Sequence, residues 1–114
     1  MMFRKVLKVL LALALCVTCI TAAAGMQDDR MAFIQKLVSK GVFQKVEVPG
    51  TVPHLWVRPA FYALDFDTKS QFVNVVYAYY VTENPKYDLV VLYDSKTGKK
   101  IGTYSKAYGG LKLE

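Results

Sequence analysis

The chain has 114 residues, of which 54% are hydrophobic, and this length suits one small domain. Its net charge is +6, but three of the basic residues fall within the first ten positions. The remaining basic residues do not cluster as they do on a nucleic-acid-binding face, so the charge argues against a nucleic-acid partner.

Residues 1–24 have the three parts of an export signal. Arg4, Lys5 and Lys8 are basic, Val9 to Ile20 is almost wholly apolar, and small residues follow up to Ala24. The apolar run is shorter than the roughly 20 residues that span a bilayer. We therefore expect cleavage after Ala24 and a periplasmic or secreted bacterial protein, with an uncleaved membrane anchor as the alternative.

The expected mature domain, residues 25–114, contains neither of the two cysteines, Cys16 and Cys19. These follow Leu15 and Thr18, whereas lipoprotein signals place a small residue before the modified cysteine, so a lipid anchor is disfavoured. Without cysteine, the domain has no disulfide, no thiol nucleophile and no cysteine-ligated metal. It must fold on its apolar core, and we expect no membrane span in it.

The first predicted element of the mature domain is a helix that begins at Asp28 and Asp29 and ends before Gly41. Acidic residues favour a helix start, and glycine is a common left-handed terminator. Its apolar stripe packs in the core and contains Phe33, Ile34, Leu37 and Val38.

A β-hairpin is predicted next, with strands over 42–48 and 54–58 joined by a proline-rich turn. In the first strand, Val42, Val46 and Val48 should face one side, and Phe43, Lys45 and Glu47 the other. In the second strand, Leu55 and Val57 should point inward, which leaves His54, Trp56 and Arg58 together on the opposite face. Residues 60–67 are expected to form a loop or one helical turn, anchored by Phe61 and Leu64.

The longest apolar stretch of the mature domain, residues 68–81, predicts a central helix. Thr68 and Gln71 fit a capping box, and Pro85 follows the expected end. Helical spacing gives a core stripe of Phe72, Val75, Val76 and Tyr79. A strand is the alternative, because valine, tyrosine and phenylalanine favour strands.

A second hairpin closes the chain, with strands over 87–93 and 100–104. The connecting Asp94-Ser95-Lys96-Thr97-Gly98-Lys99 suits a tight turn, because aspartate bonds turn amides and glycine accepts positive φ. Residues 108–114 are expected to be a tail.

Three stretches resemble a group of small exported bacterial proteins of uncharacterised function: Trp56–Tyr62, the helix around Lys69 that ends in tyrosines, and the Asp94–Lys99 turn. The resemblance covers roughly residues 37–113. It implies a bacterial, exported, single-domain protein, and it supplies no activity, ligand or catalytic residue.

Candidate chemistry has simpler explanations at each position. Gly98-Lys99-Lys100 lacks the rest of a phosphate loop and fits a hairpin turn better. Asp65 and Asp67 lack the later ligands of a calcium loop, and Asp67 is better explained as a helix cap than as part of an acid/base pair. His54 is the only histidine, which excludes a histidine-cysteine zinc site in the mature domain. We expect no metal, no cofactor and no enzymatic activity.

The eight tyrosines and one tryptophan are more informative. Beside its core stripe, the central helix carries a second line, Val73, Tyr77 and Tyr80. The hairpin offers His54, Trp56 and Arg58, and amphipathic aromatics with arginine are enriched at binding surfaces. The candidate binding site therefore consists of His54, Trp56, Arg58, Tyr77 and Tyr80. The alternative is that Tyr77 and Tyr80 cover a sheet, with only their hydroxyls in water.

The sequence thus predicts one α+β domain in which two helices pack on an antiparallel sheet of about four strands, in the order α-β-β-α-β-β. The leading function is an exported noncatalytic binding module whose partner is a protein or an envelope component. The alternative is a structural subunit of an envelope or secretion assembly. A permanent subunit should self-associate when expressed alone, because its apolar face would be uncovered.

Overall fold

The computed structural model describes residues 18–114, with side chains from residue 25 onward. Most of the predicted export signal therefore lies outside the described residues. The helices and strands follow one another in this order: α2 (Thr18–Ser39), β1 (Phe43–Glu47), β2 (His54–Val57), α3 (Pro59–Tyr62), α4 (Phe66–Glu83), β3 (Val90–Asp94), β4 (Lys100–Ser105), the 3-10 helix η2 (Lys106–Tyr108) and β5 (Gly110–Leu113).

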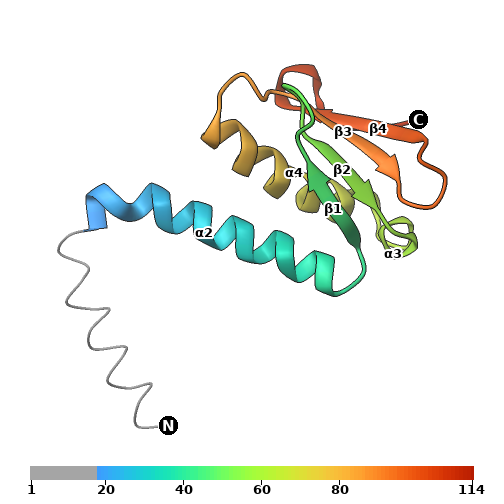
Figure 1. Ribbon diagram of the computed structural model, residues 1–114, viewed down its shortest axis with the longest axis horizontal. Coiled ribbons are helices and arrows are strands. Elements are labelled where there is room, and N and C mark those ends of the chain that lie inside the picture. The colour runs from blue at the N-terminus through green and yellow to red at the C-terminus, as the bar shows by residue number, and fades with distance from the viewer. Residues whose placement is uncertain (1–17) are drawn as a thin grey trace, which may run out of the picture.

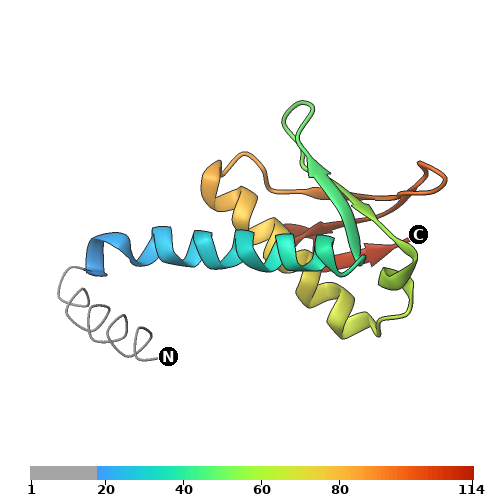
Figure 2. The same cartoon turned by 60° about the horizontal axis from the view of Figure 1, so that its bottom comes forward.

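The described chain forms two layers, a sheet and a pair of long helices that cover one of its faces (Figures 1 and 2). The α+β class is thereby confirmed. Helix α4 packs against β4 and β5, and α2 packs against α4 and β1. The opposite face of the sheet has no described helix over it (Figure 2). No helix among residues 18–114 is long and apolar enough to cross a membrane.

The sheet has five strands in the order β1-β2-β3-β4-β5, so the prediction of about four antiparallel strands was wrong in two respects. Strands β2 and β3 are parallel, while all other neighbours are antiparallel. The reason is that α3 and α4 connect β2 to β3 and return the chain to the end of the sheet at which β2 begins. Such a helical crossover makes the two strands parallel.

The fifth strand is formed by the segment that was expected to be a tail. Gly109 and Gly110 adopt positive φ values of 92° and 89°, which turn the chain back after η2. Strand β5 then pairs with β4 and buries Leu111 in the core. A side chain at Gly102 of β4 would collide with the backbone of β5, so glycine is needed where these two strands meet.

Helix α2 confirms the predicted end and corrects the predicted start. Gly41 terminates it with φ 79°, and the Val42 N–H donates to the Leu37 carbonyl at 3.0 Å. Asp28 and Asp29 lie within the helix, which begins by Thr18, so they do not cap it. Ile34 and Leu37 are buried as predicted, Phe33 is partly buried, and Val38 is exposed.

Helix α4 confirms the central helix and rules out the strand alternative. Its N-cap is Asp65, whose Oδ1 accepts a hydrogen bond from the Thr68 N–H at 2.7 Å. The predictions of a Thr68–Gln71 capping box and of Asp67 as the cap were therefore wrong. The helix starts earlier than expected, so Asp67 and Thr68 lie in its first turn.

The buried side of α4 also differs from the prediction. Val73, Val76 and Tyr77 are buried, whereas Phe72 and Tyr79 are only partly buried. The helix packs against both the sheet and α2, and it uses a different stripe of side chains for each. The stripe that faces the sheet contains Tyr77, which contacts a tyrosine of β4. The stripe that faces α2 contains Phe72, whose ring centroid lies 5.5 Å from that of Phe33.

A β-bulge explains why Phe43 and Val46 both pack in the core, although the alternation of the sequence predicted opposite faces for them. Phe43 pairs with Val57 and Val46 pairs with Leu55, and the register shifts between them. The extra residue puts Phe43 and Val46 on the same face, three positions apart. Leu55 and Val57 point inward as predicted, and both are completely buried.

Candidate functional site

We define the outer face as the side of the sheet opposite α2 and α4. Because Leu55, Val57, Val90 and Leu92 point into the core, the alternate residues of β2 and β3 point outward. The strand register arranges the outward residues in two rows. The first row takes one residue from each strand, namely Glu47, His54, Val91, Thr103 and Lys112. The second row takes one residue from each of four strands, namely Lys45, Trp56, Tyr93 and Lys100.

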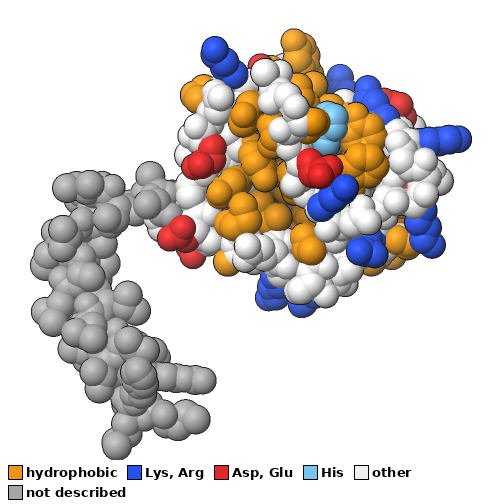
Figure 3. All heavy atoms as spheres, in the orientation of Figure 1, with side chains coloured by type: hydrophobic (Ala, Val, Ile, Leu, Met, Phe, Trp, Pro, Cys, Tyr) orange, Lys and Arg blue, Asp and Glu red, His pale blue; other side chains and the backbone are white. Residues whose placement is uncertain are grey.

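Three aromatic side chains pack together at the centre of the outer face, and we call them the aromatic stack: His54, Trp56 and Tyr93. The Trp56 and Tyr93 ring centroids are 4.8 Å apart with an angle of 24° between the planes, so these rings stack face to face. The His54 ring lies 4.9 Å from that of Tyr93 at 50°. In Figure 3 the histidine borders a hydrophobic patch with charged side chains around it.

Lysines lie at both ends of the row that contains Trp56 and Tyr93. The Lys45 Nζ sits over the Trp56 ring, 5.3 Å from its centroid, and also lies 3.3 Å from a carboxylate oxygen of Glu47. On the other side, the Lys100 Nζ is 3.4 Å from a carboxylate oxygen of Glu114. All four charged side chains of these ion pairs are about half exposed, so each pair contributes roughly 0–1 kcal/mol to stability.

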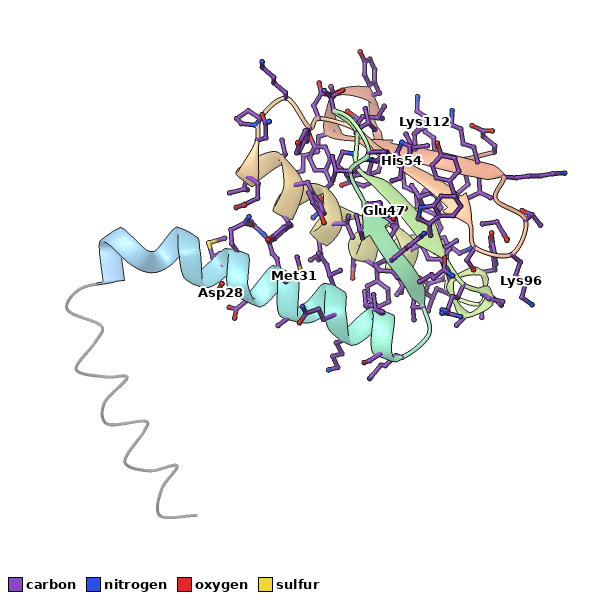
Figure 4. All side chains as sticks on the ribbon, viewed as in Figure 1. Asp28, Met31, Glu47, His54, Lys96 and Lys112 are labelled. Atoms are coloured by element: carbon purple, nitrogen blue, oxygen red, sulfur yellow. The ribbon has the colours of Figure 1, made fainter. Side chains whose placement is uncertain are left out.

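The indole N–H of Trp56 is shielded from solvent and has no hydrogen-bond acceptor among the described residues. A buried donor without an acceptor costs about 1–3 kcal/mol of stability. Figure 4 places His54, Glu47 and Lys112 on the same side of the sheet, around this region. The outer face therefore combines stacked rings, exposed ammonium groups and one unsatisfied donor.

A second polar cluster lies at the end of the sheet next to α3. The Tyr62 hydroxyl donates to Asp94 Oδ2 at 2.7 Å, and Asp94 Oδ1 accepts from the N–H groups of Lys96 and Thr97. Burial, followed by the hydrogen bond and the charge of Asp94, raises the pKa of Tyr62 to about 12. The same hydroxyl and turn amides lower the pKa of Asp94. This carboxylate holds the predicted turn together, in which Gly98 has φ 73° as expected.

The structure brings together two of the five predicted binding residues, His54 and Trp56. Arg58 is exposed beyond the end of β2, where it precedes α3. Tyr77 is on the other side of the sheet, with its ring 5.2 Å from that of Tyr104 in the core. Tyr80 is partly buried on the same helix, and this burial raises its pKa.

Tyr93 and Lys100 are neighbours of Trp56 that the sequence does not indicate. The sequence predicts a strand at Tyr93 but not the strand beside it, and the parallel pairing of β2 with β3 places Tyr93 next to Trp56. Side-chain alternation along the strand could have indicated that Tyr93 points outward, because it follows Leu92, which points into the core.

The residues considered for catalysis are spread over the fold. His54 begins β2, whereas Asp65 follows the other end of that strand and caps α4. A four-residue strand is about 10 Å long, so the two side chains belong to opposite ends of the sheet. Among the described residues, no group of three or more histidine, cysteine, aspartate or glutamate side chains is placed to hold a metal ion.

Comparison with known proteins adds no identity, since no family model, curated protein or solved structure matches the chain. The resemblance to small exported bacterial proteins therefore stays a prediction.

Proposed function

We propose that this protein is an exported, noncatalytic binding module that uses the outer face to hold a protein or envelope component. The observation that carries this proposal is the aromatic stack, set on a sheet face that no described helix covers. Large aromatic side chains usually bury their area in the core, where they stabilise the fold. Here a tryptophan, a tyrosine and a histidine are instead grouped on the side of the sheet away from the core.

The outer face has the anatomy of a protein-binding surface. Such surfaces have a small aromatic centre that excludes water, and a rim of polar and charged residues around it. Trp56 and Tyr93 occupy the centre, and both are only half-buried. Lys45, Lys100 and Lys112 are exposed around them. The stack is held by cross-strand packing, so it needs little reorganisation on binding, which favours affinity.

Export is supported by the sequence pattern of residues 1–24, and the contacts of the expected mature domain are compatible with cleavage. Gln27 is buried. Its Nε2 donates to the Tyr79 carbonyl at 2.9 Å and to Glu83 Oε2 at 3.1 Å. Cleavage after Ala24 would leave these contacts intact, so a domain of residues 25–114 keeps the joint between α2 and α4.

A capture experiment tests the proposal. The 25–114 domain is crosslinked to envelope extract as the wild type, as a Trp56→Ser, Tyr93→Ser double variant and as a Phe66→Ser control. Phe66 is 54% exposed at the start of α4, in the helical layer. We expect a partner that is captured by the wild type and the control and is lost with the double variant.

Two further measurements make the capture result decisive. Thermal denaturation must show that the double variant remains folded, and a Lys45→Glu, Lys100→Glu variant tests the same face without removing the aromatic stack. Equal capture by all variants would refute the outer face as the binding site. Light scattering distinguishes the binding module from the alternative function, a structural subunit. A structural subunit would self-associate, whereas a binding module would remain monomeric.

A further inference from the structure

We infer that the partner of the outer face is an acidic protein surface, which docks its carboxylate and carbonyl oxygens over the aromatic stack. This inference rests on the proposed function and names the chemistry of the partner. Two independent features of the outer face carry it: the direction in which the rings are exposed, and the lysines around them.

The first feature is that the ring faces are already occupied. Trp56 has Tyr93 stacked on it at 24° between planes, and the Lys45 ammonium lies over the indole. Tyr93 in turn packs against both Trp56 and His54. What the stack offers to a partner is chiefly ring edges, and the edge of an aromatic ring carries partial positive charge. Ring edges therefore attract oxygen atoms, and they offer no face on which another flat ring can stack.

The second feature is that both lysines of the row already hold carboxylates of the chain itself. Lys45 is paired with Glu47, and Lys100 with Glu114, at 3.3 and 3.4 Å. These exposed pairs are weak, so a partner's carboxylates can replace them at little cost. Lys112 adds an exposed ammonium in the neighbouring row. The outer face thus carries three lysines against two glutamates, a net charge of +1. An acidic partner would complement this charge and would associate faster at low salt.

The same geometry disfavours stacked ligands. Single-stranded nucleic acids place their bases flat on exposed aromatic faces, and here the Trp56 ring is already contacted by Tyr93 and by the Lys45 ammonium. The inference therefore makes a selective prediction, in which an acidic polypeptide binds and polyanions that depend on ring stacking do not.

Trp56 is the only tryptophan, so its fluorescence reports directly on the outer face. The 25–114 domain is titrated with poly-L-glutamate, with oligothymidylate and with polygalacturonate, at matched charge and low salt. We expect poly-L-glutamate to change the Trp56 emission and to bind about tenfold more tightly than the other two polymers. Binding should weaken as salt is added, because the lysines are exposed.

Charge reversal identifies the surface that binds. Lys45→Glu and Lys100→Glu should each weaken poly-L-glutamate binding by about tenfold, since a like charge then faces the probe. Lys36→Glu makes the same change in net charge on an exposed position of α2, and it should leave the affinity within about twofold. Denaturation curves establish that each variant is folded.

Each outcome decides the inference. It is overturned by tighter binding of oligothymidylate or polygalacturonate, by equal binding of all three polymers, by an equal loss in the Lys36→Glu control, or by no binding at all. The capture experiment keeps the two proposals apart. If poly-L-glutamate fails but the Trp56→Ser, Tyr93→Ser variant still loses its captured partner, the acidic partner is wrong and the binding module stands.

Discussion

The joint between α2 and α4 provides the most direct test of how this fold is held together. Gln27 is buried, and its amide makes three hydrogen bonds, two as donor to Tyr79 and Glu83 and one as acceptor from Arg30 at 2.7 Å. The change to test is Gln27→Ala, which keeps the helix-forming character of the position and removes all three bonds.

The expected loss can be worked out from these contacts. Each hydrogen bond contributes about 0.5–1.5 kcal/mol net, but Glu83 is exposed and Arg30 is only partly buried, so both can regain water. We therefore expect Gln27→Ala to lower the free energy of unfolding by about 2 kcal/mol. For a domain of this size, such a loss lowers Tm by roughly 8–16 °C.

Urea denaturation of the 25–114 domain, followed by circular dichroism, measures this loss. Gln35→Ala is the matched control, because Gln35 is exposed on the same helix, and its cost should stay within about 0.5 kcal/mol. Equal stabilities of the two variants would refute the reasoning and would show that the packed domain does not depend on Gln27.

Three further predictions concern a strand contact, a helix cap and the hydroxyl of Tyr62. Gly102→Ala should cost more than 1 kcal/mol (about the cost of overpacking) and speed hydrogen exchange in β5, while Gly50→Ala, in open space, should be near neutral. Asp65→Ala should lower the free energy of unfolding measurably, and Asp67→Ala by less, in urea denaturation, because only Asp65 caps the helix. Because the pKa of Tyr62 rises from 10.0 to about 12 on folding, its contribution is complete below pH 10 and is lost as the pH rises towards 12. Tyr62→Phe should therefore lose less stability than the wild type over that interval.

The results that would contradict these predictions are specific. Equal exchange in the two glycine variants would mean that β5 can shift to admit a methyl group. A larger loss for Asp67→Ala than for Asp65→Ala would restore the cap expected from the sequence. Parallel stability curves of the wild type and Tyr62→Phe between pH 10 and 12 would mean that folding does not raise the Tyr62 pKa.

Local patterns predicted much of the fold. The Asp94–Lys99 turn, the end of α2 at Gly41 and the inward direction of Leu55 and Val57 all follow from residue types at fixed spacings. The central helix was identified from its period, although β-favouring residues fill it, because its burial on two sides outweighs their intrinsic preference.

Features that depend on distant partners were not predictable. The inward turn of Phe43 needs a bulge that the pattern does not mark, and the pairing of β5 depends on Gly102 allowing close approach. The same holds for the candidate site. Trp56 was identified from its own strand, but Tyr93 joins it only through the parallel pairing of β2 and β3.

The central claim is that this protein binds its partner through the outer face of the sheet. Site-specific photo-crosslinking in living cells tests it most directly, with benzoylphenylalanine at Thr103 on the outer face or at Phe66 on the helical layer. We predict a discrete adduct from position 103 and none from position 66. An adduct from position 66 alone, or equal adducts from both positions, would contradict the account.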